Sequence, residues 1–136
     1  GLAVPNFPNL LTLAGPQSGS VATNFPRGIE EAVNWSSGFL EFLEKNKIEY
    51  FDAKLEAESL WNDHVTEMAE KILFAKEKSW FTGYNVNVDK KYKGKCLIYA
   101  GGQIRFREFI TNEKTQNYPS FDKFTTDQDV LKHLVH

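Results

Sequence analysis

The chain has 136 residues, of which 41% are hydrophobic and 25% charged, and its net charge at pH 7 is -2. This length suits one domain with a buried core. The near-neutral charge gives no overall field that attracts nucleic acid or an anionic membrane surface. The single cysteine, Cys96, excludes an internal disulfide framework and a cysteine metal cluster, and it fits a reducing compartment.

No apolar run approaches the roughly 20 residues of a membrane-spanning helix, and the N-terminus carries no signal-peptide pattern. We therefore expect a cytoplasmic chain with neither nucleic acid nor a membrane as partner, and no metal site. The chain begins with Gly1 rather than Met, so we expect it to be part of a longer protein.

The stretch from Phe7 to Phe25 predicts a strand, a loop of small residues and a helix. The strand, residues 9 to 14, is apolar on both faces, which is typical of the interior of a parallel sheet. The loop has no charge and no glycine fingerprint for phosphate, so it favours a flat, largely uncharged ligand. An ordinary strand-to-helix turn is the alternative. Few other strong strands follow, which indicates an incomplete sheet.

A helix is predicted from Pro26 to about Asn46, with Asn24 or Phe25 as its N-cap and Pro26 in its first turn. Its apolar residues span about half of the helical circumference, wider than the stripe of a typical surface helix. We therefore expect it to be buried against a large surface through Ile29, Ala32, Val33, Trp35, Phe39, Leu40, Phe42 and Leu43.

Residues 48 to 51 predict a short strand or extended link, and Asp52 is the expected N-cap of a second helix over about Lys54 to Phe74. The residues predicted to line its buried side are Ala57, Trp61, Val65, Met68, Ala69 and Ile72. His64 lies at the edge of this stripe. No His-Glu-x-x-His motif is present, so we interpret His64 as a packed or hydrogen-bonded structural residue.

Residues 79 to 95 have no helical period and contain several lysines, which fits a mobile surface loop. The aromatic pair Trp80-Phe81 in this polar context favours a loop that covers a ligand. A second buried strand is predicted at Cys96 to Ala100, and a third helix over about Gln103 to Thr115 with Ile104, Phe106, Phe109 and Ile110 facing inward. An irregular aromatic segment with Tyr118, Phe121 and Phe124 should pack back on the body, ahead of a tail. These elements predict an α+β, mainly helical fold.

Several stretches in order carry a family resemblance: FPNLLTLAGPQS at Phe7–Ser18, IEEAVNW at Ile29–Trp35, WNDHVTEMA at Trp61–Ala69, SWFTGYNVNV at Ser79–Val88, and YAGG with RFRE from Tyr99 to Glu108. In this series the chain resembles the C-terminal part of the type I Baeyer–Villiger monooxygenases, which use FAD and NADPH. The resemblance covers residues 1 to 124 and leaves the tail, residues 125 to 136, outside it.

The resemblance implies a C-terminal fragment of a flavoprotein with two dinucleotide-binding domains, whose Rossmann halves are incomplete in this chain. Residues 1 to 124 would be the C-terminal portion of the FAD-binding domain, with the NADP control loop at residues 79 to 95. The family's dinucleotide fingerprints and catalytic residues lie upstream. We therefore expect no catalytic residue in this segment, and no activity of the segment alone.

Carried over by position, Ser20, Val21 and Ala22 would line the substrate pocket. Phe25 would present its backbone amide to FAD, and Trp80 would contact NADP. The chain departs from the family pattern at Gly19, where a proline is often present, and at Asn87-Val88-Asp89, where Pro-Gly-Lys is common. The first departure is expected to loosen the pocket wall, and the second to alter loop closure.

The activity implied is the insertion of one oxygen atom from O2 next to a ketone carbonyl, giving an ester or lactone, with NADPH and FAD. The remainder of the same polypeptide would be a partner. The alternatives are a related flavin monooxygenase that oxidises nitrogen or sulfur centres, and a standalone helical binding module without catalysis. The wide apolar arc of the first helix also predicts that the isolated piece self-associates.

Overall fold

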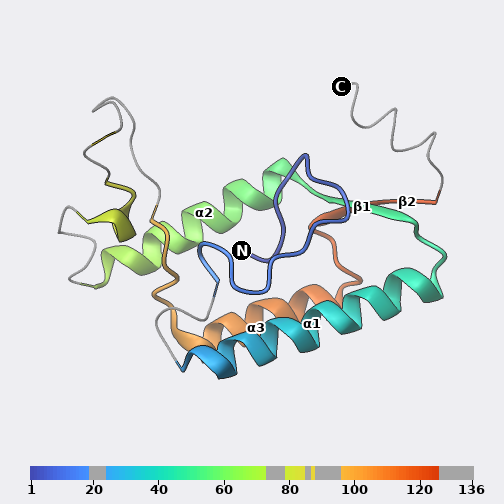
Figure 1. The fold of residues 1–136 in the computed structure, drawn as a ribbon, viewed down its shortest axis with the longest axis horizontal. Helices are drawn as coiled ribbons and strands as arrows, with labels where there is room; N and C mark the ends of the chain where they lie inside the picture. The colour runs from blue at the N-terminus through green and yellow to red at the C-terminus, as the bar shows by residue number, and fades with distance from the viewer. Residues whose placement is uncertain (19–23, 73–78, 85–86, 88–95, 126–136) are drawn as a thin grey trace.

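The computed structural model describes residues 1–18, 24–72, 79–84, 87 and 96–125. The elements follow in the order α1 (Phe25–Lys45), β1 (Tyr50–Ala53), α2 (Leu55–Glu70), the short 3-10 helix η2 (Trp80–Thr82), α3 (Gly102–Thr115) and β2 (Phe121–Phe124). Helices α1 and α3 lie side by side, and α2 lies across from them with the N-terminus between (Figure 1). The predicted α+β, mainly helical character is confirmed.

Helix α1 begins where the sequence predicts. Asn24 is its N-cap and accepts a hydrogen bond from the backbone N–H of Arg27 at 3.2 Å, and Pro26 lies in the first turn, where its missing N–H costs nothing. The buried residues are Gly28, Ala32, Trp35, Ser36, Phe39 and Leu43. Val33 and Leu40 were expected to be buried as well, but they are 40% and 53% exposed. The apolar arc of α1 is therefore wider than the surface it packs against.

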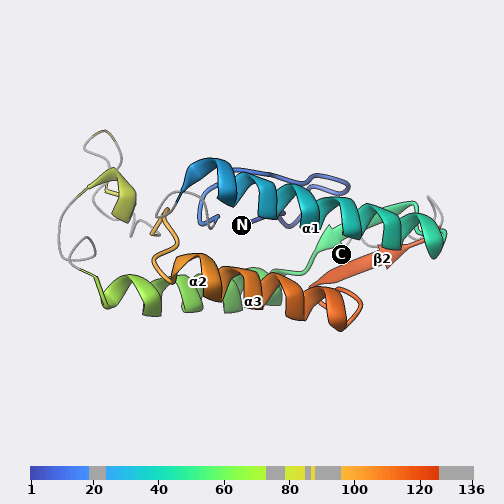
Figure 2. The same ribbon diagram turned by 90° about the horizontal axis from the view of Figure 1, so that it is seen from below.

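Helix α3 packs beside α1 through Phe106 and Ile110, which are four residues apart and so share one face. Ile104 was predicted to face inward but is 74% exposed, because a residue two positions from Phe106 lies on the opposite side of a helix. Phe109, also predicted inward, is at the edge of the packed face and partly exposed. Figure 2 shows α1 on one side of the molecule, with α2 and α3 on the other.

Helix α2 buries Val65, Met68 and Ala69, as its apolar period predicts. Its N-cap is Lys54, so the predicted cap at Asp52 is wrong. Asp52 instead lies within β1, where its carboxylate Oδ2 accepts a hydrogen bond from the backbone N–H of Asn6 at 3.2 Å. The regular helix ends at Glu70, and residues 73 and 74 of the predicted helix lie outside the described residues.

The described residues contain one sheet, an antiparallel pair in which Tyr50 of β1 faces Phe124 of β2 and Ala53 faces Phe121. The segment predicted to be irregular after α3 therefore contains a strand. This ladder joins two segments that are far apart in the sequence, residues 50 to 53 and residues 121 to 124.

Two predicted strands, residues 9 to 14 of the expected parallel sheet and the buried strand at residues 96 to 100, are irregular, so both predictions are wrong. Asn9 has φ of 59°, outside the β region, and it bonds Phe51 through both its backbone N–H and its side-chain Oδ1. Leu97 pairs with two different segments, through Gln17 and Phe81, rather than with one strand. The predicted burial at Ile98 and Tyr99 is nevertheless confirmed.

An aromatic cluster forms the core beneath α1. Phe39 is 0% exposed, and its ring centroid lies 4.5 Å from that of Tyr118, 4.7 Å from Phe121 and 4.9 Å from Phe51. Such tilted and edge-on pairs are the arrangements that aromatic quadrupoles favour. Tyr118 and Phe121 thus pack back onto the body as predicted. Among the described residues, no helix has the length and hydropathy needed to cross a bilayer.

Candidate functional site

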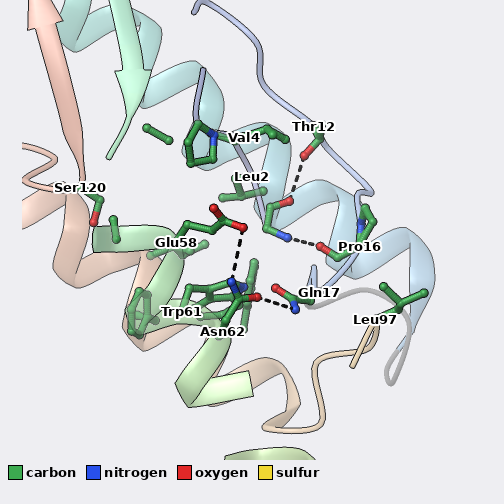
Figure 3. Close-up of a pocket in the computed structure, with 18 of the residues that line it drawn as sticks. Leu2, Val4, Thr12, Pro16, Gln17, Glu58, Trp61, Asn62, Leu97 and Ser120 are labelled. Atoms are coloured by element: carbon green, nitrogen blue, oxygen red, sulfur yellow. Dashed lines mark hydrogen bonds between the residues drawn. The ribbon is translucent and has the colours of Figure 1, made fainter. Parts of the chain in front are cut away.

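A cavity of about 580 Å³ opens between α2, α3 and the N-terminal segment. This volume lies within the range of small-molecule pockets. Its lining is predominantly apolar, with polar side chains along part of the wall (Figure 3). The principal wall residues come from the N-terminal segment (Leu2, Val4, Gln17), α2 (Glu58, Trp61, Asn62), η2 and its C-terminal side (Trp80, Tyr84), the segment before α3 (Leu97) and α3 (Phe106, Phe109).

The aromatic wall of the cavity is built around Trp61 in α2. The indole stacks on Tyr99, with ring centroids 5.2 Å apart, and meets Phe109 edge-on at 5.0 Å and Phe106 at 6.1 Å. Trp61 was predicted on the buried side of α2 and is half-buried, because one side of its ring borders the cavity. Its indole Nε1 is buried and has no hydrogen-bond partner among the described residues. A buried donor of this kind favours a ligand or chain segment that carries an acceptor.

His64 supports this wall from behind. Its Nε2 lies 3.0 Å from the hydroxyl of Tyr99, and its ring stacks on Phe109 with centroids 5.7 Å apart. Burial raises the pKa of the Tyr99 hydroxyl. A Cβ at Gly101 would lie 2.3 Å from the same hydroxyl oxygen, so glycine permits the close approach. His64 is thus a packed and hydrogen-bonded structural residue, as predicted, and the described residues hold no cluster suited to a metal ion.

The polar edge of the cavity is a chain of side-chain amides. Gln17 Nε2 donates to Asn62 Oδ1 at 3.0 Å, and Asn62 Nδ2 donates to Glu58 Oε1 at 3.4 Å (Figure 3). Gln17 Nε2 also donates to the carbonyl of Cys96 at 2.9 Å. These residues were not predicted from the sequence. The signal available was Asn62 directly after Trp61 in an apolar stripe, and a glutamine in an otherwise small-residue turn.

Of the two residues predicted to contact cofactors, one lines the cavity and the other does not. Trp80, predicted for NADP, lines the cavity, is 66% exposed and stacks on Phe81 with centroids 4.4 Å apart. Phe25, predicted for FAD, is the first residue of α1 and 50% exposed, and it does not line this cavity. The predicted substrate residues Ser20, Val21 and Ala22 lie outside the described residues, as do Gly19 and Val88-Asp89.

The basic residues of α3 have structural contacts. Arg107 forms an ion pair with Glu31 of α1, and Arg105 Nη1 lies 3.1 Å from Met68 Sδ in α2. These contacts join α3 to both neighbouring helices.

No protein-family model matches the chain. Among curated proteins, cyclohexanone 1,2-monooxygenase from Acinetobacter sp. is 34% identical over 122 residues, covering 90% of this chain and 22% of that protein. Phenazine N-monooxygenase from Lysobacter antibioticus is 30% identical over 121 residues, covering 89% of this chain and 21% of that protein.

Among solved structures, cyclohexanone monooxygenase from Rhodococcus sp. Phi1 bound to NADP+ matches with a TM-score of 0.80 and 31% identity, covering 93% of this chain and 23% of that chain. An oxidized steroid monooxygenase bound to NADP matches with a TM-score of 0.80 and 26% identity, covering 93% of this chain and 22% of that chain. The chain thus spans about a fifth of the length of the relatives it matches.

Proposed function

Since this chain is homologous to a segment of the Baeyer–Villiger monooxygenases, we propose that it forms part of an FAD- and NADPH-dependent enzyme of this type. The enzyme inserts one oxygen atom from O2 next to a ketone carbonyl and releases an ester or lactone. The similarity along 90% of the chain to a cyclohexanone 1,2-monooxygenase is the observation that carries the proposal.

Residues 1 to 124 would then be the C-terminal portion of the FAD-binding domain, with the NADP control loop at residues 79 to 95 and a tail at residues 125 to 136. The dinucleotide folds would be completed by the remainder of the polypeptide, and this segment alone would be inactive. About four-fifths of the length of the relatives lies outside the part that this chain matches.

Trp80 is the residue that we assign to NADP. Its ring packs against Phe81 and is 66% exposed at the mouth of the cavity, so it offers the flat, apolar surface on which an aromatic cofactor ring stacks. Phe25 fits a backbone contact with FAD, because the first N–H groups of a helix have no partner within the helix. Ser20, Val21 and Ala22, between this helix and the turn at Gly15, remain the proposed wall of the ketone pocket.

When bound, NADPH and FAD would supply the electrons and activate O2. This chain's residues would bind and orient. The aromatic wall around Trp61 and the ring of Trp80 would exclude water from the apolar side of the site. We assign none of the charged side chains among the described residues to proton transfer.

Oxidation of a nitrogen centre is the second candidate, favoured by the 30% identity to a phenazine N-monooxygenase. The test uses the full-length protein with its flavin, and measures NADPH oxidation with no substrate, with cyclohexanone and with phenazine. Faster oxidation with cyclohexanone and a lactone product support ketone oxidation, whereas an N-oxide from phenazine without any lactone favours the second candidate. A full-length protein without flavin that leaves NADPH untouched would contradict both and favour a binding module.

A further inference from the structure

Gln17 occupies the point where three segments of the cavity wall meet. Its backbone N–H donates to the carbonyl of Leu97 at 2.8 Å, and its side-chain Nε2 donates to the carbonyl of Cys96 at 2.9 Å and to Asn62 Oδ1 at 3.0 Å. A primary amide has two N–H groups, and here each has an acceptor. Gln17 thus joins its own turn both to residues 96 and 97 and to helix α2.

The same hydrogen-bond chain continues to the residue assigned to NADP. The backbone N–H of Leu97 donates to the carbonyl of Phe81 at 2.8 Å, and Phe81 is the neighbour on which the Trp80 ring stacks. Gln17, Leu97 and Trp80 all line the cavity. The backbone of Gln17 is therefore connected to η2 by two hydrogen bonds, with Leu97 as the single residue between them.

On its other side Gln17 begins the loop that we assign to the ketone and the flavin. Ser18 follows it, is buried, and donates its backbone N–H to the carbonyl of Gly15 at 3.2 Å, which closes the turn. Gln17 itself has φ of 60°, in the left-handed region where a residue with a Cβ is strained. The side-chain hydrogen bonds to Asn62 and Cys96 contribute against that strain.

From this geometry we propose that Gln17 is a positioning residue, which holds the turn Gly15–Ser18 in a fixed relation to Trp80. The effect that we expect on ketone binding rests on the proposed function, in which the residues that follow this turn line the ketone pocket and Trp80 contacts NADP. Gln17 does not touch the reacting atoms. It keeps the turn Gly15–Ser18 and Trp80 at a fixed distance from each other, so that a ketone is bound at the correct depth beside the cofactor.

The test is Gln17→Glu in the full-length, flavin-loaded protein. Glutamate has the same length but no N–H groups, so it loses both side-chain bonds and places a carboxylate against the Cys96 carbonyl. We expect faster hydrogen exchange at the amides of Leu97 and of residues 82 and 83. We also expect the KM for cyclohexanone to rise by about tenfold, while the rate of flavin reduction at saturating NADPH stays within about twofold of wild type.

Gln116→Glu is the matched control. Gln116 makes the same kind of bond, from Nε2 to Asn112 Oδ1 at 3.2 Å, but on an exposed part of the chain that does not line the cavity. It should change neither the exchange rates nor the ketone KM. Asn62→Leu is a second variant for the case in which Gln17→Glu fails to fold. It removes one of the two acceptors, and should raise exchange and the KM in the same direction by a smaller factor.

An unchanged hydrogen-exchange rate at the backbone amide of Leu97 in the folded Gln17→Glu and Asn62→Leu variants would overturn the proposal. Faster exchange with a wild-type KM would overturn the link to ketone binding and leave Gln17 with a purely structural role. If the wild-type protein oxidises no NADPH with any substrate, the proposed function fails. The exchange measurement still decides in that case whether Gln17 ties the turn to η2, so the two failures are distinguishable.

Discussion

The indole Nε1 of Trp35 in α1 donates a buried hydrogen bond of 2.9 Å to the main-chain carbonyl of Ile110 in α3. The two residues are 75 positions apart, and both are buried in the hydrophobic core. This bond fixes the register in which α1 and α3 lie side by side, and it satisfies a polar atom that would otherwise be buried without a partner.

Replacement of this indole should destabilise the fold. Trp35→Phe removes the donor and part of a buried ring, and we expect the free energy of unfolding to fall by about 1–3 kcal/mol. Urea denaturation of the chain measures the change. Trp80→Phe is the control, because Trp80 is 66% exposed and its replacement should cost less than about 0.5 kcal/mol. Equal losses in the two variants would contradict a structural role for the Trp35 bond.

Phe39 lies at the centre of the aromatic core, with 0% of its surface exposed. Phe39→Ala leaves a cavity among the rings of Trp35, Tyr118 and Phe121, and should lower the free energy of unfolding by about 3–5 kcal/mol. The neighbouring Leu40→Ala is the control, since Leu40 is 53% exposed and should cost far less. Equal shifts of the denaturation midpoint in Phe39→Ala and Leu40→Ala would contradict the central position of Phe39 in the core.

The pKa of Tyr99 gives an expectation for alkaline pH. Burial raises the pKa of its hydroxyl above the usual value of 10.0, so the folded state retains this proton more strongly than the unfolded state. The associated stability is fully present below pH 10 and is lost as the pH rises through the folded pKa. Tyr99→Phe should therefore flatten the decline of the unfolding free energy above pH 10. A decline of wild-type steepness in Tyr99→Phe would refute the assignment.

Trp80→Ala tests the proposed cofactor contact in the full-length protein. Loss of one aromatic stacking partner is worth about 0.5–1.5 kcal/mol, so we expect the Kd for NADP+ to rise by about 2- to 12-fold. Flavin content should stay at the wild-type level, because Trp80 is assigned to NADP and not to FAD. The matched control is Phe7→Ala, which removes an exposed aromatic ring that does not line the cavity. An unaltered Kd in Trp80→Ala would exclude the stacking role.

The exposed apolar residues Val33 and Leu40 lie seven positions apart on one face of α1. We propose that this face is covered by the remainder of the polypeptide in the full-length protein, so the isolated chain should self-associate through it. Light scattering of Val33→Glu/Leu40→Glu should then show a smaller mean mass than wild type at the same concentration. Asn34→Glu, which adds a charge elsewhere on α1, should not. A wild-type chain that is monomeric at all concentrations would contradict this expectation.

Local signals in the sequence were sufficient for the helices. Asn24 and Pro26 predict the start of α1 correctly, because a cap bonds a backbone group only three residues away. The spacing of Val65, Met68 and Ala69 likewise predicts the packed face of α2, since neighbours on a helix face are three and four residues apart. The aromatic packing of Tyr118 and Phe121 also follows from their apolar character.

The candidate site was predicted in part. Trp80 could be singled out as a large aromatic in a polar stretch, and it does line the cavity. Gln17 and Asn62 were not singled out, because the sequence does not show which partners an amide side chain has before the turn, α2 and residues 96 and 97 are brought together. Burial of Asp52 could not be predicted either, because an aspartate just before a helix is typically its N-cap.

The positions of α1, α2 and α3, the N-cap of α1 and the family resemblance could all be predicted from the sequence, because they depend on residues close together or on a fixed order of motifs. Three features could be read from the packed fold alone: Tyr50 pairs with Phe124, residues 9 to 14 and 96 to 100 form no strands, and Val33 and Leu40 stay exposed. The physical reason is that a strand or a buried face exists only when a partner surface satisfies its hydrogen bonds or covers its apolar atoms, and those partners are distant in the chain.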